Sequence, residues 1–418
     1  MSDQLAIHGG QRAVSADLPN FLSAAGRTFG PEEEVLVIAA LRSGCLSRNG
    51  GTMVKGLERD FAEALGVTHT VSCSSGTACI HLALAALDLE PGDEVIVPPI
   101  TDIGSILPIL WQNAIPVFAD VDALTMVLDP NEVEKRITPR TRAVIAVHLA
   151  GMPCPMDELL EICKQHRIPL IEDCSQAYWA EYKGKLVGSM GDIGCFSLQQ
   201  SKHMSCGEGG LMVTSNDTYA RRALLFSDKA WPRESTSLGS ARFLFLSQNY
   251  RMSELAGAVA WAQLKKVQDT VTRRRARAGE LSQLISELEG VAVPYVSAST
   301  NPAYWLYMLR ITESSQTSAK DFGDALVAEG VPAWVRYIVD PLYLSPIFTT
   351  PQTYGTSGYP FSQFAHQSFV RGLCPQAEQA LSQVIAIHWN ENYTVAQVAE
   401  IALAIRKVAR HFAAQKEQ

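Results

Sequence analysis

The sequence of 418 residues lacks the features of membrane proteins and nucleic-acid-binding proteins. No apolar run approaches the roughly 18 residues that a membrane-spanning helix needs. Basic residues are not in excess, because 35 Lys and Arg stand against 43 Asp and Glu, for a net charge of −8. A chain of this charge has no electrostatic attraction to nucleic acid or to an anionic membrane. We therefore expect neither of them as a partner.

The nine cysteines form no C-x-x-C pair, and no Cys/His cluster has the spacing of metal ligands. Their odd number predicts reduced thiols and no metal site. The first ten residues, MSDQLAIHGG, lack the basic patch and apolar core of a signal peptide, so we expect a cytoplasmic protein. Internal repeats and low-complexity tracts are also missing, and the fold must therefore follow from the order of strands and helices.

The middle of the chain, at about residues 60–220, alternates short apolar strands with helices, such as those expected at residues 77–87 and 154–166. The predicted strands are residues 69–74, 93–99, 115–121, 141–149, 168–174, 191–198 and 209–215. Short buried strands that alternate with helices predict an α/β fold, in which a mostly parallel central sheet is flanked by helices on both faces.

The two ends of the chain have a different texture. Apolar residues recur at helical spacing over residues 31–65 and 253–290. The last 130 or so residues are mixed α/β and end in an amphipathic helix. We predict a large domain at residues 1–270 and a smaller C-terminal α/β domain at residues 271–418. Ligands of open α/β sheets bind beyond the carboxyl ends of the strands, so reactive residues are sought there.

Lys202 follows the predicted strand at residues 191–198, in the segment CFSLQQSKH, and precedes a glycine-rich turn at residues 207–210. Burial lowers the pKa of a lysine and frees its amine to form a Schiff base with a carbonyl cofactor. Taken alone, Lys202 could equally be an ordinary surface lysine in the loop after a strand.

Asp173 ends another predicted strand, in the segment IEDCSQA, 29 residues before Lys202. A buried carboxylate needs a cationic partner. The protonated pyridine nitrogen of pyridoxal phosphate (PLP) is such a partner, and the pairing makes the cofactor an electron sink. A cap or a salt bridge would satisfy the carboxylate equally well.

Residues 74–78, SSGTA, join a predicted strand to a predicted helix. A glycine turn with hydroxyl residues at a helix N-terminus presents free N–H groups and the positive end of the helix dipole to a phosphate. Ordinary helix caps use the same residues. Taken together, the three motifs predict a PLP site, with a phosphate cradle, an imine-forming lysine and a carboxylate for the pyridine nitrogen.

The order of these motifs, followed by QNYRMSELAGAVAWAQL, resembles the DegT/StrS family of sugar and cyclitol aminotransferases, which are fold type I PLP enzymes. The resemblance extends from LAIHGG near the start to IHWNENYT at residues 387–394. It implies that Lys202 binds the cofactor and shuttles the proton, that Asp173 bonds the pyridine nitrogen and that Gln176 lies against the ring. The residues implied to hold the phosphate are Gly76, Thr77 and Ser197.

Two residues of the stretch QNYRM concern a partner subunit and the substrate. The resemblance implies that Asn249 reaches the cofactor phosphate of the neighbouring subunit, so that the enzyme is a homodimer with shared active sites. Arg251 meets a substrate carboxylate or forms an ordinary salt bridge; both readings are open.

One position departs from the family pattern. Family members usually carry an aromatic residue directly after the threonine of a V-P-x-x-T stretch, where it stacks on PLP, but this chain reads VPPITD with Asp102. Either Tyr178 or Trp231 covers the cofactor ring, or Asp102 contacts an amine or hydroxyl group of the substrate. His388 is a further candidate for a substrate contact. The residues expected to serve the core, the rim or a solvated face are His148, Tyr304, Trp305, Trp334 and residues 273–275.

The resemblance implies a PLP-dependent aminotransferase that moves the amino group of L-glutamine or L-glutamate to a keto group by ping-pong kinetics. The segments IHWNENYT and LAIHGG favour a cyclitol acceptor such as scyllo-inosose, in aminocyclitol or antibiotic biosynthesis, and a nucleotide-linked keto-deoxysugar is the alternative. Relatives that dehydrate sugars replace the lysine with histidine, so Lys202 favours transamination over dehydration or elimination. A non-catalytic regulator would need a basic helix-turn-helix, and the sequence offers none.

Overall fold

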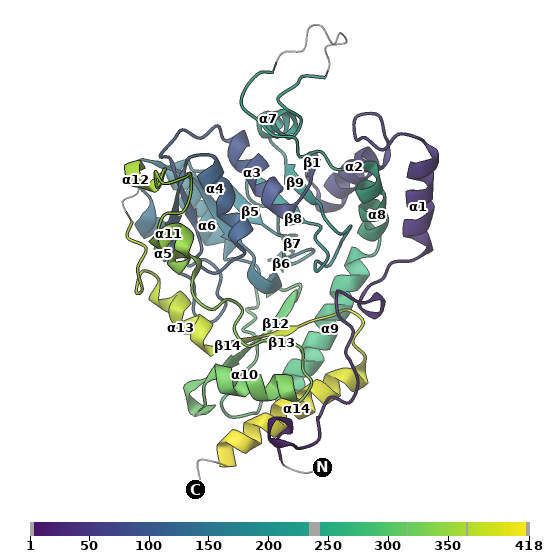
Figure 1. Cartoon of the computed structure of the whole chain (residues 1–418), viewed down its shortest axis with the longest axis vertical. Helices are drawn as coiled ribbons and strands as arrows, with labels where there is room; N and C mark the ends of the chain where they lie inside the picture. Colours follow the sequence, from purple (N-terminus) through teal and green to yellow (C-terminus); the bar gives the residue numbers. More distant parts are fainter. Residues whose placement is uncertain (1–3, 234–242, 316, 365–366, 415–418) are drawn as a thin grey trace.

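The computed structural model describes residues 4–233, 243–315, 317–364 and 367–414, and its centre is a seven-stranded sheet (Figure 1). The strands are β1 (His69–Cys73), β2 (Glu94–Val97), β3 (Ile115–Phe118), β4 (Thr141–Val147), β5 (Leu170–Asp173), β8 (Ile193–Ser197) and β9 (Gly210–Thr214). Their order is β1-β9-β8-β5-β4-β2-β3, and only β9 is antiparallel to its neighbours. The prediction of a mostly parallel sheet from these seven runs is confirmed.

Helices cover the sheet on both sides, which is why β2, β3, β5, β8 and β9 are buried along their whole length. The covering helices include α3 (Gly76–Ala86), α4 (Leu107–Trp111), α5 (Pro130–Arg136), α6 (Met156–His166) and α7 (Asp217–Ser227) (Figure 1). In α3, ten of the eleven residues are buried, so this helix packs inside the domain and its N-terminus is held firmly against the sheet.

The two long helical stretches predicted from the sequence are each divided. Residues 31–65 form α1 (Pro31–Arg42) and α2 (Met53–Leu65), separated by Gly44, whose φ of +69° favours glycine. Residues 253–290 form α8 (Glu254–Leu264) and α9 (Val267–Ile285). Lys266, at the break, forms ion pairs with Glu32 and Glu33 of α1.

A second, antiparallel sheet lies below the first in the order β10-β12-β14-β13 (Figure 1). Its strands are β10 (Val291–Ala292), β12 (Leu306–Ile311), β13 (Ala333–Trp334) and β14 (Val384–His388). Helices α9, α10 (Ala319–Ala328) and α14 (Val395–Ala414) pack on it. The remaining elements are the small sheet β11 (Thr300–Asn301), β6 (Glu181–Tyr182) and β7 (Lys185–Leu186), and the short helices α11 (Pro346–Thr349), α12 (Phe361–Phe364) and α13 (Pro375–Gln383).

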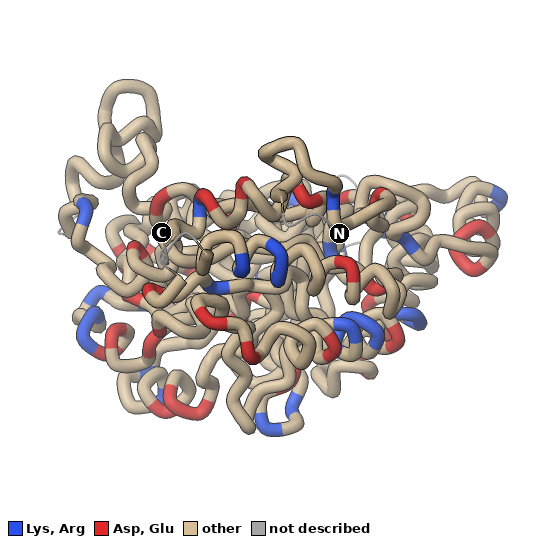
Figure 2. Tube along the Cα trace, turned by 90° about the horizontal axis from the view of Figure 1, so that it is seen from below, with Lys and Arg blue, Asp and Glu red and all other residues tan. Residues whose placement is uncertain are grey.

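Two segments pack with the core that is distant from them in sequence. Leu5, Val14 and Leu18 pack with the second sheet and α14, whereas Tyr343 and Phe361 pack with the first. Both termini lie at the lower end of the molecule (Figures 1 and 2). The division at residue 270 stays a prediction, although residues 5–18 pack with the smaller core rather than with the larger one.

The surface and the thiols agree with the composition. Figure 2 shows basic and acidic residues interspersed along the chain. Within the described ranges, no helix is both long and apolar enough to cross a membrane. All nine cysteines are free thiols, and only Cys45 and Cys206 are not fully buried.

Candidate active site

A cavity of about 430 Å³ lies at the carboxyl ends of the parallel strands, within the size range of small-molecule sites. Residues that end β4, β5 and β8 and the first turn of α3 contribute to its wall. It brings together seven of the predicted site residues, namely Gly76, Thr77, Asp102, Asp173, Gln176, Ser197 and Lys202.

Lys202 lies in the loop after β8 and is only 9% exposed, so it is not a surface lysine. Its Nζ lies 4.1 Å from the centre of the Trp305 ring, a cation–π contact that suits a desolvated cation. Burial lowers its pKa from 10.5 to about 8, and the charges of Asp102 and Asp173 offset part of that effect. A lysine with this pKa is partly neutral near physiological pH and can act as a nucleophile and a base.

Asp173 ends β5 and is 5% exposed. Its Oδ2 accepts a hydrogen bond from Ser105 Oγ at 2.7 Å, and its Oδ1 accepts one from the main-chain N–H of Ser175 at 3.1 Å. No cation within the described part of the chain forms an ion pair with this carboxylate. The salt-bridge alternative is therefore wrong, and a buried negative charge lines the cavity without a protein cation bonded to it.

The N-terminus of α3 meets the end of β8 at the phosphate cradle. Ser75 caps the helix, with its Oγ accepting from Ala78 N–H at 3.0 Å. A Cβ on Gly76 would lie 2.7 Å from the Cβ of Ser197, so only glycine allows this approach. The first N–H groups of the helix have no intrahelical acceptor and, with the hydroxyls of Thr77 and Ser197, they form a site that suits an anion.

Gln176 and Asp102 stand on the cavity wall in fixed positions. Gln176 Oε1 accepts from Ala150 N–H at 2.6 Å, and its Nε2 donates to the hydroxyl of Tyr337 at 2.9 Å. Asp102 Oδ1 accepts from Gly104 N–H at 2.7 Å, while the residue as a whole is exposed to the cavity. Asp102 therefore caps a turn and still presents a carboxylate to a ligand.

An aromatic wall, which the sequence interpretation missed, faces these polar groups. Phe21, Trp305 and Trp334 line the cavity. Trp305 is a core residue, as predicted, and Trp334 is 36% exposed at the rim, but both also line the cavity, so a contact with a ligand stays open for them. His388 lies behind this wall, with its ring centre 4.6 Å from that of Trp334 and 6.2 Å from that of Phe21. No local motif reveals the wall, because its members come from distant parts of the chain.

Several predicted substrate contacts lie elsewhere in this chain. Tyr178 is fully buried among aromatic rings and donates to the carbonyl oxygen of Ser197 at 3.0 Å, so it neither covers a cofactor nor meets a substrate. Trp231 stacks under the guanidinium of Arg233, at 3.7 Å. Arg251 pairs with Asp228, as its salt-bridge alternative predicted.

The main chain of Asn249 forms an isolated antiparallel β-bridge with that of Asp228, and Asn249 does not line the cavity of its own chain. Its predicted contact with a neighbouring subunit therefore stays a prediction. His148 is a core histidine, as expected. It is fully buried, its Nε2 lies 3.1 Å from Glu172 Oε2, and its Nδ1 accepts from Cys154 N–H at 3.0 Å.

A sequence model of the DegT/DnrJ/EryC1/StrS aminotransferase family matches residues 28–406. The chain belongs to this family. It is 32% identical to an L-glutamine:2-deoxy-scyllo-inosose aminotransferase of Streptomyces lividus, over 98% of this chain and 99% of the relative. It is 34% identical to a GDP-perosamine synthase of Caulobacter vibrioides, over 79% of this chain and 87% of that protein.

Solved structures agree with this assignment. The aminotransferase superimposes on 3-amino-5-hydroxybenzoic acid synthase with a TM-score of 0.81 at 27% identity, covering 92% of this chain and 97% of the other. DesV of S. venezuelae, solved in complex with a ketimine intermediate, gives a TM-score of 0.79 at 29% identity, covering 90% and 94%. The chain is therefore a PLP-dependent aminotransferase with the fold predicted from its sequence.

The cavity fits this cofactor. The glycine cradle at Gly76 leaves room for a phosphate where a Cβ would touch Ser197. The carboxylate of Asp173 has no ion-pair partner within the described residues, and the amine of Lys202 is buried with a pKa of about 8. A phosphate, a pyridine nitrogen and an aldehyde each find a complementary group.

Proposed function

We propose that this aminotransferase moves the amino group of L-glutamine or L-glutamate to a keto group of a cyclitol of the scyllo-inosose type, in aminocyclitol biosynthesis. The observation that carries the proposal is the end-to-end similarity to the 2-deoxy-scyllo-inosose aminotransferase, which covers 98% of this chain. The GDP-perosamine synthase is slightly more similar in identity, at 34% against 32%, but the match covers only 79% of the chain. That second relative favours a nucleotide-linked keto sugar as the other candidate acceptor.

The charge of the cavity supports an acceptor without phosphate groups. Among the residues that line it, Asp102, Asp173 and Glu208 are acidic and Lys202 is the one Lys or Arg. A bound cofactor phosphate adds further negative charge. A neutral polyol meets no repulsion from this lining and can hydrogen-bond to its carboxylates, whereas a diphosphate finds no second Lys or Arg among the lining residues.

The lining residues have distinct proposed roles toward the cofactor. Lys202 would bind its aldehyde carbon, Asp173 would accept a hydrogen bond from the protonated pyridine nitrogen, and Gln176 would lie beside the ring hydroxyl. The phosphate would be held by Gly76, Thr77 and Ser197. When bound, PLP supplies the electron sink that makes the Cα–H bond of an amino acid acidic.

Lys202 carries the proton transfers. With a pKa of about 8, its amine is neutral often enough near pH 7 to 8 to take a proton from Cα of the donor and to return it at the other side of the reaction. The aromatic wall beside it, above all Trp305, limits access of water to the amine. Donor and acceptor would occupy the same site in turn, with the amino group kept on the enzyme between the two half-reactions, so we expect ping-pong kinetics.

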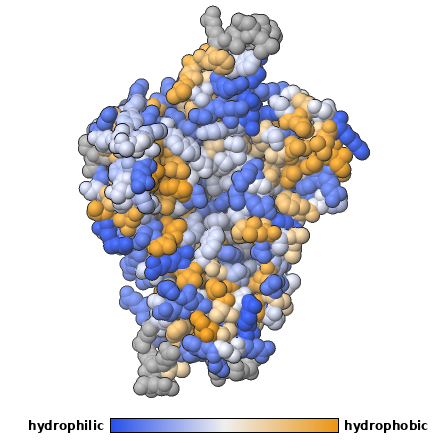
Figure 3. All heavy atoms as spheres, viewed as in Figure 1, coloured by the Kyte–Doolittle hydropathy of each residue, from blue (hydrophilic) through white to orange (hydrophobic). Residues whose placement is uncertain are grey.

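A homodimer is part of the proposal, and an apolar face on α1 supports it. Val35, Ile38 and Leu41 are 64%, 45% and 54% exposed. Figure 3 shows hydrophobic atoms gathered over α1. Apolar patches of this kind mark interaction surfaces. Light scattering should give twice the 45.6 kDa of one chain. A cytoplasmic location stays a prediction.

The first experiment is the visible absorbance of the purified protein before and after L-glutamine or L-glutamate is added. Bleaching of the yellow colour is the expected first half-reaction. Adding scyllo-inosose or 2-deoxy-scyllo-inosose should then restore the colour and yield an amino-cyclitol detectable by mass spectrometry. Restoration only by a nucleotide-linked 4-keto-6-deoxyhexose would refute the cyclitol proposal. Loss of a hydroxyl group from the sugar without stoichiometric oxo-acid would indicate dehydration instead.

Asp102→Asn tests whether the acceptor meets the Asp102 charge. Asparagine keeps the cap on Gly104 and removes the charge. We expect kcat/KM for the keto-cyclitol to fall by about tenfold or more, because a hydrogen bond to a charged group contributes about 1.5–3 kcal/mol. The rate of the first half-reaction with the amino donor should change less, and only because loss of the Asp102 charge lowers the pKa of Lys202 further. An equal loss in both half-reactions would show that Asp102 serves the cofactor rather than the acceptor.

A further inference from the structure

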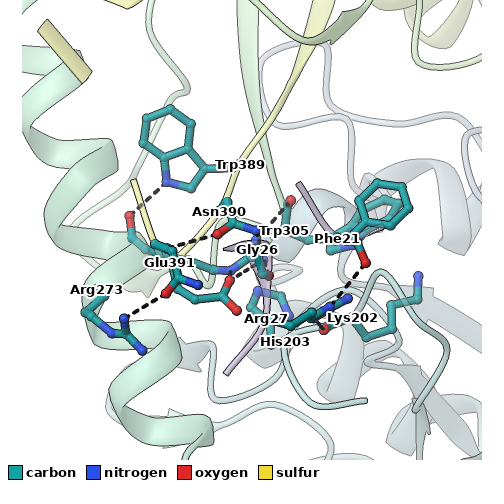
Figure 4. Close-up of polar contacts among 12 residues, drawn as sticks. Phe21, Gly26, Arg27, Lys202, His203, Arg273, Trp305, Trp389, Asn390 and Glu391 are labelled. Atoms are coloured by element: carbon teal, nitrogen blue, oxygen red, sulfur yellow. Dashed lines mark hydrogen bonds and ion pairs between the residues drawn. The ribbon is translucent and has the colours of Figure 1, made fainter. Parts of the chain in front are cut away.

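The segment at residues 20–27, which we call the N-terminal strap, lies between the Lys202 loop and the residues that follow β14 (Figure 4). On one side, Gln200 Nε2 donates to the carbonyl oxygen of Phe21 at 2.8 Å. On the other side, Asn390 Nδ2 donates to Gly26 O at 3.1 Å and Asn392 Nδ2 to Ala25 O at 2.8 Å. The strap thus joins the reactive loop to the smaller core.

Arg27 ends the strap, and its guanidinium points at the reactive lysine. It is 8% exposed, and its Nη1 donates to the main-chain carbonyl oxygen of Lys202 at 2.9 Å. Its Nε donates to Phe21 O at 3.4 Å, and its Nη2 is buried without a hydrogen-bond partner among the described residues. Burial lowers its pKa to about 10, although the charge of Glu391 acts the other way.

The neighbouring Arg274 shows what a stabilising buried arginine looks like here. It is 1% exposed, and its Nη2 pairs with Glu391 Oε2 at 2.7 Å. Its Nη1 also donates to the carbonyl oxygens of Tyr304 and Trp305. Arg27 forms no ion pair with a carboxylate in the described ranges, so its burial is costly for stability. Its shortest contact is with the peptide of the residue that does the chemistry.

The peptide of Lys202 is held from several sides. Its N–H donates to Gln199 O at 3.0 Å, and Trp305 Nε1 donates to the preceding carbonyl, Ser201 O, at 3.0 Å. Arg27 supplies the bond to the carbonyl of Lys202 itself. The lysine side chain has four rotatable bonds, so the position of Nζ depends on a fixed main chain beneath it.

We propose that Arg27 is a positioning residue for transamination: through the carbonyl oxygen of Lys202 it holds the lysine amine where the proton is transferred. The buried guanidinium then lowers the stability of the fold but serves to place the amine, instead of forming an ion pair. Misplacement of a catalytic group by about 1 Å can slow a reaction about 100-fold. The strap also couples that placement to the smaller core through Asn390.

The test compares Arg27→Met and Arg27→Lys with the same changes at Arg275. Arg275 is a matched control, because it too donates to main-chain carbonyls, those of Trp179 and Pro302, but it does not touch the Lys202 loop. Three quantities are measured on PLP-loaded enzyme: the bleaching rate with L-glutamate or L-glutamine by stopped flow, the pH midpoint of the visible absorbance, and the melting temperature.

Arg27→Met should slow bleaching by about 10- to 100-fold. It should also shift the pH midpoint, because the lysine nitrogen is no longer held at the same place relative to the Asp102 and Asp173 carboxylates, whose charges act on its pKa. Arg27→Lys keeps the charge without the planar fork, so it should lose rate with a smaller change in midpoint. Both Arg275 variants should keep the rate and midpoint of the unchanged enzyme, whatever their melting temperature.

The proposal is overturned if both Arg27 variants bleach at the original rate, or if the Arg275 variants lose as much rate as they do. If Arg27→Met does not fold, Arg27→Lys against Arg275→Lys decides alone. The positioning role of Arg27 depends on the proposed amino donors only where it is tested by the bleaching rate, because the pH midpoint is measured without a donor. If the unchanged enzyme bleaches with neither donor, the donor proposal fails. Arg27 is then judged by the pH midpoint, where equal midpoints for Arg27→Met and the unchanged enzyme would overturn the inference.

Discussion

Lys202 makes the cofactor-free enzyme less stable than it would be with an apolar side chain at this position. Lys202 is 9% exposed, and no carboxylate within the described residues is bonded to its ammonium group. The fall of its pKa from 10.5 to about 8 measures what folding costs this group. Replacing Lys202 with Met, an unbranched apolar residue of similar length, should abolish transamination and stabilise the cofactor-free fold.

The size of the effect follows from the pKa. A fall from 10.5 to about 8 corresponds to about 3 kcal/mol, at about 1.4 kcal/mol for each pKa unit. The contact of Nζ with the Trp305 ring is worth about 0.5–2 kcal/mol and is lost in the variant. We therefore expect Lys202→Met to raise the free energy of unfolding at pH 7 by about 1–3 kcal/mol.

The pH dependence has a defined sign. The folded pKa lies below the unfolded value, so the folded protein binds fewer protons between pH 8 and 10.5. The unchanged enzyme therefore gains stability as the pH rises through this window, and Lys202→Met does not share that gain. The advantage of the variant should be full below pH 8 and should shrink by pH 10.5.

Urea unfolding of both cofactor-free proteins at several pH values measures this difference. Lys266→Met is the control of opposite sign, because Glu32 and Glu33 hydrogen-bond to Lys266 and raise its pKa. Lys266→Met should lower the free energy of unfolding at pH values below the pKa of Lys266 in the folded protein. A Lys202→Met protein that is no more stable at pH 7, or whose advantage does not change with pH, would refute the description of Lys202 as a desolvated ammonium.

Two further substitutions test the cradle and the core. Gly76→Ala places a Cβ 2.7 Å from the Cβ of Ser197 and should weaken PLP binding by about tenfold or more. Absorbance titration with PLP measures this change. Gly279→Ala is the control and should leave PLP binding unchanged, because no atom lies within 4 Å of the added Cβ. Tyr178→Phe removes the bond to Ser197 O and should lower the free energy of unfolding by about 1 kcal/mol. Its half-reaction rates should stay within about twofold; a selective loss of acceptor turnover would restore Tyr178 as a substrate contact.

Local sequence patterns were sufficient for the elements that carry the cofactor. Each of the seven apolar runs became a strand, because a strand buried on both faces must be apolar along its length. Lys202 and Asp173 were predicted as cofactor residues because Asp173 ends such a strand and Lys202 lies in the loop that follows one. The cradle at Gly76 was found because a helix cap leaves a recognisable signature in few residues.

Helix breaks and packing partners were harder to predict. The pattern over residues 253–290 is helical throughout, yet α8 ends at Leu264 and α9 begins at Val267. Lys266, at that break, bonds to Glu33 on α1, more than 230 positions away. Such a long-range contact contributes to where a helix ends, but it does not change the spacing of apolar residues from which the helix was predicted.

The sequence by itself determined the sheet and placed Lys202 and Asp173 at its carboxyl edge, since these depend on short segments whose burial and turn chemistry are local. Only the tertiary structure decided what surrounds them. Tyr178 was moved into the core because Phe61 and Phe196 pack around its ring. Phe21 and Trp334 became an active-site wall, and Arg27 reached the Lys202 carbonyl, because residues more than 100 positions apart were brought together. Contacts of that range arise from the packing of the two cores on each other, and no pattern within a single segment encodes them.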